Sequence, residues 1–172
     1  MIRLAKLEDL DKIQNIYAHA RLFMASTGNP NQWVNNYPSC EILQNDINKG
    51  HLHVCYDDQG IYGVFVFFVG VDETYGYIEG AWLNNEEYGV IHRVASSGAK
   101  KGMFTEVYEY VCKFIDNIRI DTHHDNLVMQ NILNKHEFIA EHPYCVAWNQ
   151  SIYFEHVFFW ICFRNHYTFI SR

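Results

Sequence analysis

Positive charge and long apolar runs are both scarce in this sequence of 172 residues. Its 13 lysines and arginines stand against 20 aspartates and glutamates, a net charge of −7. This balance excludes a general nucleic-acid binder, which needs a basic face. No apolar run approaches the roughly 20 residues that span a bilayer, and residues 1–6 lack the pattern of a secretory signal. We therefore expect a cytoplasmic protein with no nucleic-acid or membrane partner.

Closely spaced cysteines are also missing. The chain has five cysteines, none in a Cys-x-x-Cys pair: Cys40, Cys55, Cys112, Cys145 and Cys162. Their odd number and wide spacing indicate reduced, mostly buried thiols. Among ten histidines only His123 and His124 adjoin. Because neighbours on a strand point to opposite faces, the sequence predicts no metal site.

The apolar spacing is typical of one α+β domain. The length fits a single domain over 1–172, and no repeat or linker divides it. Alternating and β-rich runs predict strands at 2–4, 51–56, 61–69, 77–83, 89–95 and 118–120. Apolar residues at helical spacing predict helices at 10–24, 40–47, 103–114 and 126–133, the second capped by Ser39 and the last by Asp125. The pattern is therefore α+β with a mixed sheet.

One loop joins a strand to a helix with small and basic residues. It reads Ser96, Ser97, Gly98, Ala99, Lys100, Lys101 and Gly102, and Met103 follows. Glycines let main-chain amides approach a ligand closely, and a helix N-terminus favours negative charge. The two lysines add mobile positive charge in an acidic chain. The loop thus supplies what a diphosphate needs, although a Gly-Lys loop by itself is more often an ordinary exposed turn.

Two common nucleotide motifs do not fit this loop. A Walker loop reads Gly-x-x-x-x-Gly-Lys-Ser/Thr, but Met103 and Phe104 follow Gly102 here. No Gly-x-Gly-x-x-Gly occurs, which excludes the dinucleotide fingerprint. The loop alone leaves its ligand open.

Three stretches together resemble one protein family. They are Gly-Asn-Pro-Asn-Gln-Trp from Gly28, Tyr-Gly-Val-Ile-His-Arg-Val-Ala-Ser from Tyr88, and Asp-Asn-x-x-Met-Gln-x-x-Leu-x-Lys from Asp125. Over residues 1–138 the chain resembles the GNAT superfamily of N-acetyltransferases, in particular a bacterial branch with an Asn-Pro-x-Gln-Trp loop. The resemblance implies a single GNAT-like domain with a mixed, mostly antiparallel central sheet flanked by helices. It also implies acetyl-coenzyme A as the acetyl donor, and no metal.

The resemblance further implies where that donor binds. In the family the strand before the loop pairs with the pantetheine arm, and that strand ends here with Val94, Ala95 and Ser96. The loop and helix start hold the pyrophosphate, which implies Gly98, Ala99, Lys100, Lys101, Gly102 and Met103. Asn126 resembles the family asparagine that contacts the cofactor arm, or alternatively it caps a helix. Trp33 and Tyr37, in an aromatic loop, are predicted to border the acceptor pocket.

Transfer to an amine requires a proton acceptor, because a lysine-like amine with a pKa near ~10.4 is protonated at pH 7. The candidates are Glu79, in Tyr-Ile-Glu-Gly-Ala-Trp, and His92, in the strand that feeds the loop. Glu79 could equally be a strand-edge charge, and His92 a hydrogen-bonded core histidine. The expected donor to the thioester oxyanion is a main-chain N–H near Val94.

The departing thiolate lacks its usual acid. Similar enzymes often place a tyrosine five residues before the phenylalanine of Lys-x-Gly-Phe; here that position is Leu133, and Glu137 replaces the glycine. Tyr144 or Tyr153 would substitute, or the thiolate, from a thiol of pKa near ~8.5, leaves without help.

No recognisable base adjoins Cys112 or Cys145, so a covalent route is disfavoured. We expect direct transfer in a ternary complex, with a small-molecule or peptide amine as the acceptor. A non-catalytic acyl-coenzyme A binding module is the alternative.

Residues 139–172 differ from the rest of the chain. Ten of these 34 residues are aromatic and four are charged, against 28 and 33 of 172 overall. The atypical segment is therefore either a divergent form of the family's last strands or the product of an altered reading frame. The run 157–163 is too short to span a membrane and is predicted to be a core or interface strand, with a homodimer through this segment as one outcome.

Overall fold

A central seven-stranded sheet organises the chain. The computed structural model describes residues 1–75, 84–141 and 157–163. The strands are β1 (Ile2–Leu4), β2 (Leu52–Asp57), β3 (Gly60–Val69), β4 (Gly89–Ser96), β5 (Asn117–His123), β6 (Ile139–Glu141) and β7 (Val157–Phe163). Their order is β1-β2-β3-β4-β5-β7-β6, and each neighbouring pair is antiparallel except β4 and β5. The predicted α+β fold with a mixed, mostly antiparallel sheet is confirmed.

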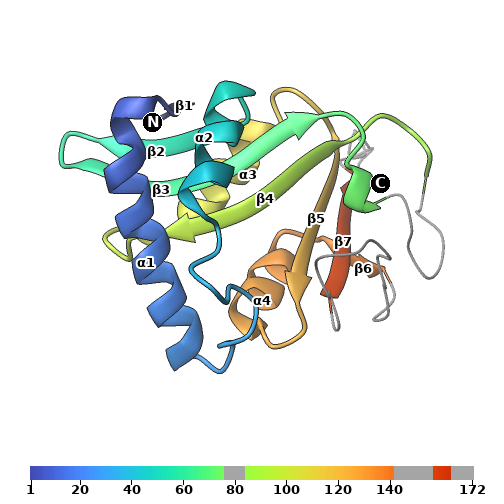
Figure 1. Ribbon diagram of the computed structural model, residues 1–172. Coiled ribbons are helices and arrows are strands. Elements are labelled where there is room, and N and C mark those ends of the chain that lie inside the picture. Colours follow the sequence, from blue (N-terminus) through green and yellow to red (C-terminus); the bar gives the residue numbers. More distant parts are fainter. Residues whose placement is uncertain (76–83, 142–156, 164–172) are drawn as a thin grey trace.

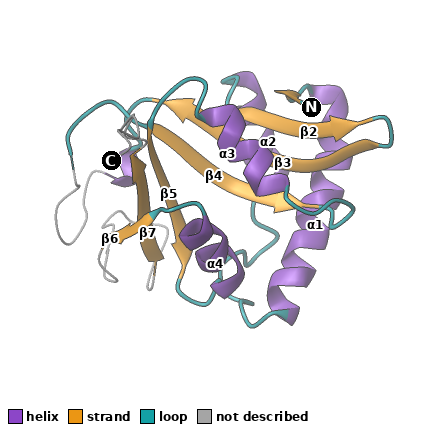
Figure 2. Cartoon of the chain, turned by 180° about the vertical axis from the view of Figure 1, so that it is seen from behind, coloured by secondary structure: helices purple, strands orange, loops and turns teal. Residues whose placement is uncertain are grey.

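Helices cover both faces of this sheet (Figures 1 and 2). They are α1 (Leu10–Ser26), α2 (Cys40–Asn48), α3 (Met103–Val111) and α4 (Leu127–Lys135), with short 3-10 turns η1 (Leu7–Asp9) and η2 (Glu73–Tyr75). The two views place α1 and α2 on one face and α3 and α4 on the other. Within the described ranges, no helix is long and apolar enough to cross a membrane.

Alternation along β3 divides the core into two layers. Val64 packs with α1 residues such as Ile13, whereas the next residue, Phe65, packs in the cluster that contains Val107 of α3. All four side chains are fully buried, and each such burial stabilises the fold by about 1.5–3 kcal/mol. Because both faces are covered, β3 needs apolar residues at successive positions.

Local turn chemistry sets most element ends near their predicted positions. Ser39 Oγ accepts a hydrogen bond from Ile42 N at 3.3 Å and caps α2, as expected. The predicted run 157–163 is a strand, β7, paired with β5 along its whole length. The strand predicted at 77–83 lies outside the described residues.

Two predicted helix ends are wrong. α3 stops at Val111, because Phe114 N donates to Val111 O at 2.9 Å, three residues back, and the chain tightens into a turn. α4 is capped by Asn126 and not by Asp125: Asn126 Oδ1 accepts from Met129 N at 3.0 Å, which confirms the alternative that Asn126 caps a helix. The helix starts one residue later than the sequence indicated.

The parallel pair β4 and β5 separates part-way along its length. The two strands pair only from Gly89 with Ile118 to Ile91 with Ile120. Beyond that point β5 stays paired with β7, while β4 continues to Ser96 beside β3 alone. Figure 1 shows the two strands diverging, so one edge of β4 is left without a strand partner among the described residues.

Candidate active site

A cavity of about 1260 Å³ occupies the opening between β4 and β5. Its walls include residues 92–96 of β4, residues 120–123 of β5, and the starts of α3 and α4. The loop after α1 contributes the predicted acceptor-side residues Trp33 and Tyr37, whose ring centroids lie 6.5 Å apart. Strand edges, a helix start and aromatic side chains therefore meet in one space.

β4 bulges where it enters the cavity. It has one residue more than β3 over this stretch, and Arg93 adopts a φ of 51°, a left-handed conformation that costs a non-glycine residue roughly 1–2 kcal/mol. Tyr17 Oη donates to Arg93 O at 2.8 Å, and the guanidinium donates to Tyr37 Oη at 3.0 Å and to Asp46 at 2.8 Å. These three bonds hold the bulge, which re-aims the following residues 94–96.

The loop from 97 to 102 presents main-chain amides at the start of α3. Gly98 and Gly102 have φ values of 80° and 79°, which glycine adopts at little cost. The first hydrogen bond of α3 runs from Glu106 N to Gly102 O at 3.3 Å, so the preceding amides have no partner within the helix. Two of the loop amides are already engaged, because Gly98 N donates to Ser96 Oγ at 3.1 Å and Ala99 N to Ser97 Oγ at 3.3 Å. Residues 98–102 are all exposed. This geometry is suited to an anion.

The two loop lysines differ, contrary to the expectation that both are mobile. Lys100 Nζ lies 2.8 Å from Glu106 Oε1 and 4.7 Å above the Tyr62 ring, so its charge is already engaged. Lys101 is exposed and forms no ion pair with any described residue. Glu106 is six residues further along, on the first turn of α3, where the helix brings it back toward Lys100.

The cavity brings together most of the predicted cofactor residues. Those that line it are Val94, Ala95, Ser96, Lys100, Gly102, Met103 and Asn126. Gly98, Ala99 and Lys101 lie in the same loop but are not part of the cavity wall. Since the side chains of Ala95 and Met103 are buried in the core, these two residues present mainly their main chain to the cavity.

Asn126 both caps α4 and joins it to the loop after α1. Its Oδ1 accepts from Met129 N, and its Nδ2 donates to Gln32 Oε1 at 2.9 Å. The same Gln32 oxygen accepts from Asn29 Nδ2 at 2.7 Å. The Asn-Pro-Asn-Gln-Trp stretch is thereby tied to the end of β5, across the cavity from β4.

A buried polar cluster lies where β4 and β5 part. His92 Nε2 is 2.8 Å from Asp72 Oδ2, and His92 Nδ1 is 2.7 Å from Asp121 Oδ1. Tyr75 Oη donates to the same Asp121 oxygen at 2.8 Å. All four residues line the cavity, and the His92 side chain is only 15% exposed.

The cluster holds His92 as a cation. Burial alone would lower the pKa of His92, but the carboxylates of Asp121 and Asp72 outweigh it and raise the pKa to about 9. Burial likewise opposes ionisation of Asp72, yet the hydrogen bonds from His92 and Thr74 lower its pKa to about 2. With both ring nitrogens engaged, the geometry favours the hydrogen-bonded core histidine over a free general base.

Asp72, Tyr75 and Asp121 were missed by sequence reasoning. One signal was present: Asp121 directly follows Ile120 in a strand predicted to be buried, where a carboxylate needs a partner. Its partners lie on other elements, so the sequence did not identify them.

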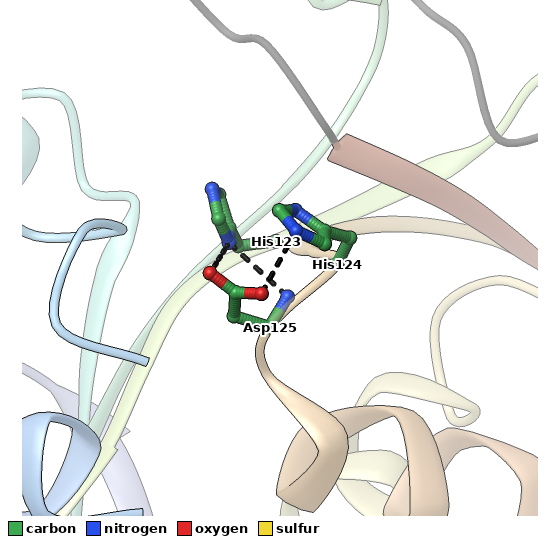
Figure 3. Close-up of side chains that lie close together, drawn as sticks. All are labelled: His123, His124 and Asp125. Atoms are coloured by element: carbon green, nitrogen blue, oxygen red, sulfur yellow. Dashed lines mark hydrogen bonds and ion pairs between the residues drawn. The ribbon is translucent and has the colours of Figure 1, made fainter. Parts of the chain in front are cut away.

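The prediction that His123 and His124 point to opposite faces is wrong. β5 ends at His123, so His124 already belongs to the turn, where strand alternation no longer applies. The two ring centroids are 4.5 Å apart. Both rings approach the Asp125 carboxylate (Figure 3).

Solved acetyltransferase structures match the chain along nearly its whole length. A Staphylococcus aureus Mu50 protein, provisionally assigned as an acetyltransferase, is 30% identical, with 96% of this chain and 98% of that chain covered and a TM-score of 0.67. A GNAT-family acetyltransferase from Streptococcus agalactiae 2603 is 26% identical, with 96% and 95% covered and a TM-score of 0.80. The chain belongs to the GNAT superfamily.

More distant GNAT-like structures share the fold. The protein yncA from Salmonella typhimurium, provisionally assigned as an acetyltransferase and solved with acetyl-CoA, is 14% identical, with 96% of this chain and 94% of that chain covered and a TM-score of 0.56. No protein-family model matches the chain, and neither does any curated protein.

The two departures from the GNAT pattern around the Lys-x-Gly-Phe signature have different structural settings. Leu133, at the usual tyrosine position, is fully buried in the core and offers no acid. Glu137, at the usual glycine position, has a φ of 61°, and Phe138 N donates back to Leu133 O at 3.1 Å. This helix ending favours glycine. Glu79 and Tyr144 lie outside the described residues.

Proposed function

We propose that this GNAT protein moves the acetyl group of acetyl-coenzyme A to an amine by direct transfer in a ternary complex. One observation carries the proposal: a single cavity extends from the main-chain edge of β4 and the start of α3 to the carboxylates beside His92. A donor that needs main-chain and anion recognition, and an acceptor that carries positive charge, would therefore meet in one space.

The donor half draws support from both geometry and relatives. The edge of β4 over residues 94–96 has no β5 partner, so an extended amide-containing arm would add to it like a strand. The amides of residues 100–102, in the exposed part of the loop, suit the pyrophosphate. yncA holds acetyl-CoA, and N-acetylglutamate synthase from Neisseria gonorrhoeae was solved with coenzyme A and N-acetyl-glutamate.

The acceptor half rests on the polar cluster and the aromatic loop. Asp72 and Asp121 carry two negative charges around one imidazolium, a net charge of −1 that attracts a cationic amine. Trp33 and Tyr37 supply apolar contact at the same cavity. The neighbouring Brucella melitensis protein is a ribosomal-protein-alanine N-acetyltransferase, and an amine acceptor is the corresponding proposal for this chain.

Glu79, directly or through a relay of water, is proposed to remove the proton of the acceptor amine. His92 positions the carboxylates of Asp72 and Asp121. Because His92 is already protonated near neutral pH, it does not take a proton from the amine. The N–H near Val94 would donate to the oxyanion. None of the cysteines in the described ranges lines the cavity, which supports direct transfer; Tyr144 remains the predicted acid.

A second candidate is a non-catalytic acyl-coenzyme A binding module. It is favoured by Leu133, a fully buried apolar residue at the position where similar enzymes have a tyrosine acid, so this position supplies no proton donor. Saturable coenzyme A binding without thiol release over a broad amine panel would establish this alternative.

The deciding experiment follows free thiol during incubation with acetyl-coenzyme A and a panel of small amines and peptides. We expect amine-dependent thiol release and an acetylated product. Glu79→Gln should lower turnover and move its pH profile, while coenzyme A affinity stays unchanged. A profile that keeps its shape removes Glu79 as the base.

The predicted cytoplasmic location and the homodimer through the C-terminal segment accompany this proposal. Cys40 and Cys55 form no disulfide with another described residue, which suits a reducing compartment. Sedimentation at several concentrations tests the dimer.

A further inference from the structure

Two imidazoles and a carboxylate converge at the turn between β5 and α4. One donor atom from each of His123, His124 and Asp125 lies within 4.8 Å of the other two. The carboxylate oxygens face different rings: Oδ1 is 2.8 Å from His124 Nε2, and Oδ2 is 3.6 Å from His123 Nδ1 (Figure 3). Imidazole nitrogen with carboxylate oxygen is a donor set that Zn²⁺ and similar divalent ions accept.

The separations fit a single ion after small side-chain rotations. Donors bound at about 2.0–2.2 Å to a tetrahedral Zn²⁺ lie roughly 3.3–3.5 Å from one another. The 3.6 Å pair already matches this spacing, and the 2.8 Å pair must lengthen by less than ~1 Å. His124 and Asp125 are 39% and 29% exposed, so both side chains have room to rotate.

The main chain of the turn is held in place by its surroundings. Gln130 Nε2 donates to His123 O at 3.2 Å and to His124 O at 2.7 Å. Asp125 N donates to His123 Nδ1 at 3.2 Å, so this nitrogen carries its lone pair, and an ion bound at Nδ1 would replace the amide as its partner. The three donors are thus presented by a fixed backbone.

We propose that His123, His124 and Asp125 bind one divalent transition-metal ion, with Zn²⁺ as the reference ion and water completing its coordination. Two neutral imidazoles and one carboxylate leave the Zn²⁺ site with a charge of +1. His123 lines the cavity, and the next residue after Asp125 caps α4. A bound ion therefore adds positive charge at the cavity wall and fixes the turn that starts α4.

Calorimetric titration of the chelator-treated full chain with Zn²⁺ tests this site. We expect one saturable binding event and a thermal midpoint that rises with Zn²⁺ concentration. His124→Gln and Asp125→Asn should each weaken the affinity at least ~10-fold, since even outer partners of metal ligands have that effect. His19→Gln, at an exposed histidine of α1, is the matched control and should leave the affinity unchanged.

Co²⁺ supplies a second readout that does not depend on activity. Its visible absorption intensifies when water ligands give way to a low-coordinate protein site, and this change should disappear in His124→Gln but persist in His19→Gln. Because the substituted side chains are partly exposed, the metal-free thermal midpoints should match the parent. A missing Zn²⁺ isotherm, or equal responses of all three variants, overturns the proposal.

Discussion

The two ends of the cavity are built by different means. At the start of α3, an exposed loop with the left-handed Gly102 forms the surface, and the side chain of Lys100 is held by Glu106. Where β4 and β5 part, buried side chains form it, and His92 lies between Asp72 and Asp121. A main-chain surface tolerates many sequences, whereas a buried charge cluster fails if one member is lost.

The strongest test of this comparison removes the cation from the cluster. His92→Leu would leave Asp72 and Asp121 as neighbouring carboxylates without their partner, so we expect stability to fall by roughly 3–5 kcal/mol. Urea denaturation at pH 7 measures the loss. If His92→Leu is as stable as the parent, the ion pairs of His92 do not stabilise the fold.

The pH dependence of folding stability tests whether the positive charge of His92 stabilises the cluster. The pKa of His92 rises from an ordinary 6.5 to about 9 on folding, so its stabilisation is fully present below about pH 6.5 and is lost as the pH rises through 9. The difference corresponds to roughly 3 kcal/mol. Denaturation midpoints from pH 6 to pH 10 should decline in the parent. In His92→Gln the decline from this source should be absent.

At the main-chain end, a smaller effect is expected. Lys101→Glu reverses the exposed loop charge and should weaken acetyl-coenzyme A affinity about tenfold, or ~1.4 kcal/mol, without altering stability. Lys12→Glu, on the exposed face of α1, makes the same charge change elsewhere and serves as the control. Equal affinities for the two variants would remove the loop from the donor site.

The smallest effect concerns Glu137, a residue with a side chain at a backbone conformation that favours glycine. Glu137 occupies a φ of 61° at the end of α4, so Glu137→Gly should raise thermal stability by about 0.5–1 kcal/mol. Glu109→Gly, within the helix α3, should lower stability by a similar amount. A loss of stability in Glu137→Gly would mean that its side chain has a stabilising role.

Local rules were sufficient for much of the fold. The Ser39 cap, the β2–β3 hairpin and the glycine loop before α3 all depend on residues close in sequence, and each lies where it was predicted. The main-chain part of the cavity follows from these elements. It could be located because strand, loop and helix are consecutive.

Contacts between side chains that are distant in sequence could not be predicted from these local rules. His92 reaches Asp72 across 20 residues and Asp121 on a parallel neighbour, and no periodicity encodes such pairs. The Lys100–Glu106 ion pair was also missed, because it depends on how α3 turns back over the loop. The error at His124 arose from applying strand alternation one residue past the end of β5.

The position of β7 has a consequence for synthesis of the protein. β7 lies between β5 and β6, although both precede it in the chain. Until residues 157–163 leave the ribosome, the outer edge of β5 therefore lacks its neighbour, and β6 has no strand to join. An unpaired edge recruits other chains, so the nascent protein is most prone to aggregate shortly before Val157–Phe163 emerges.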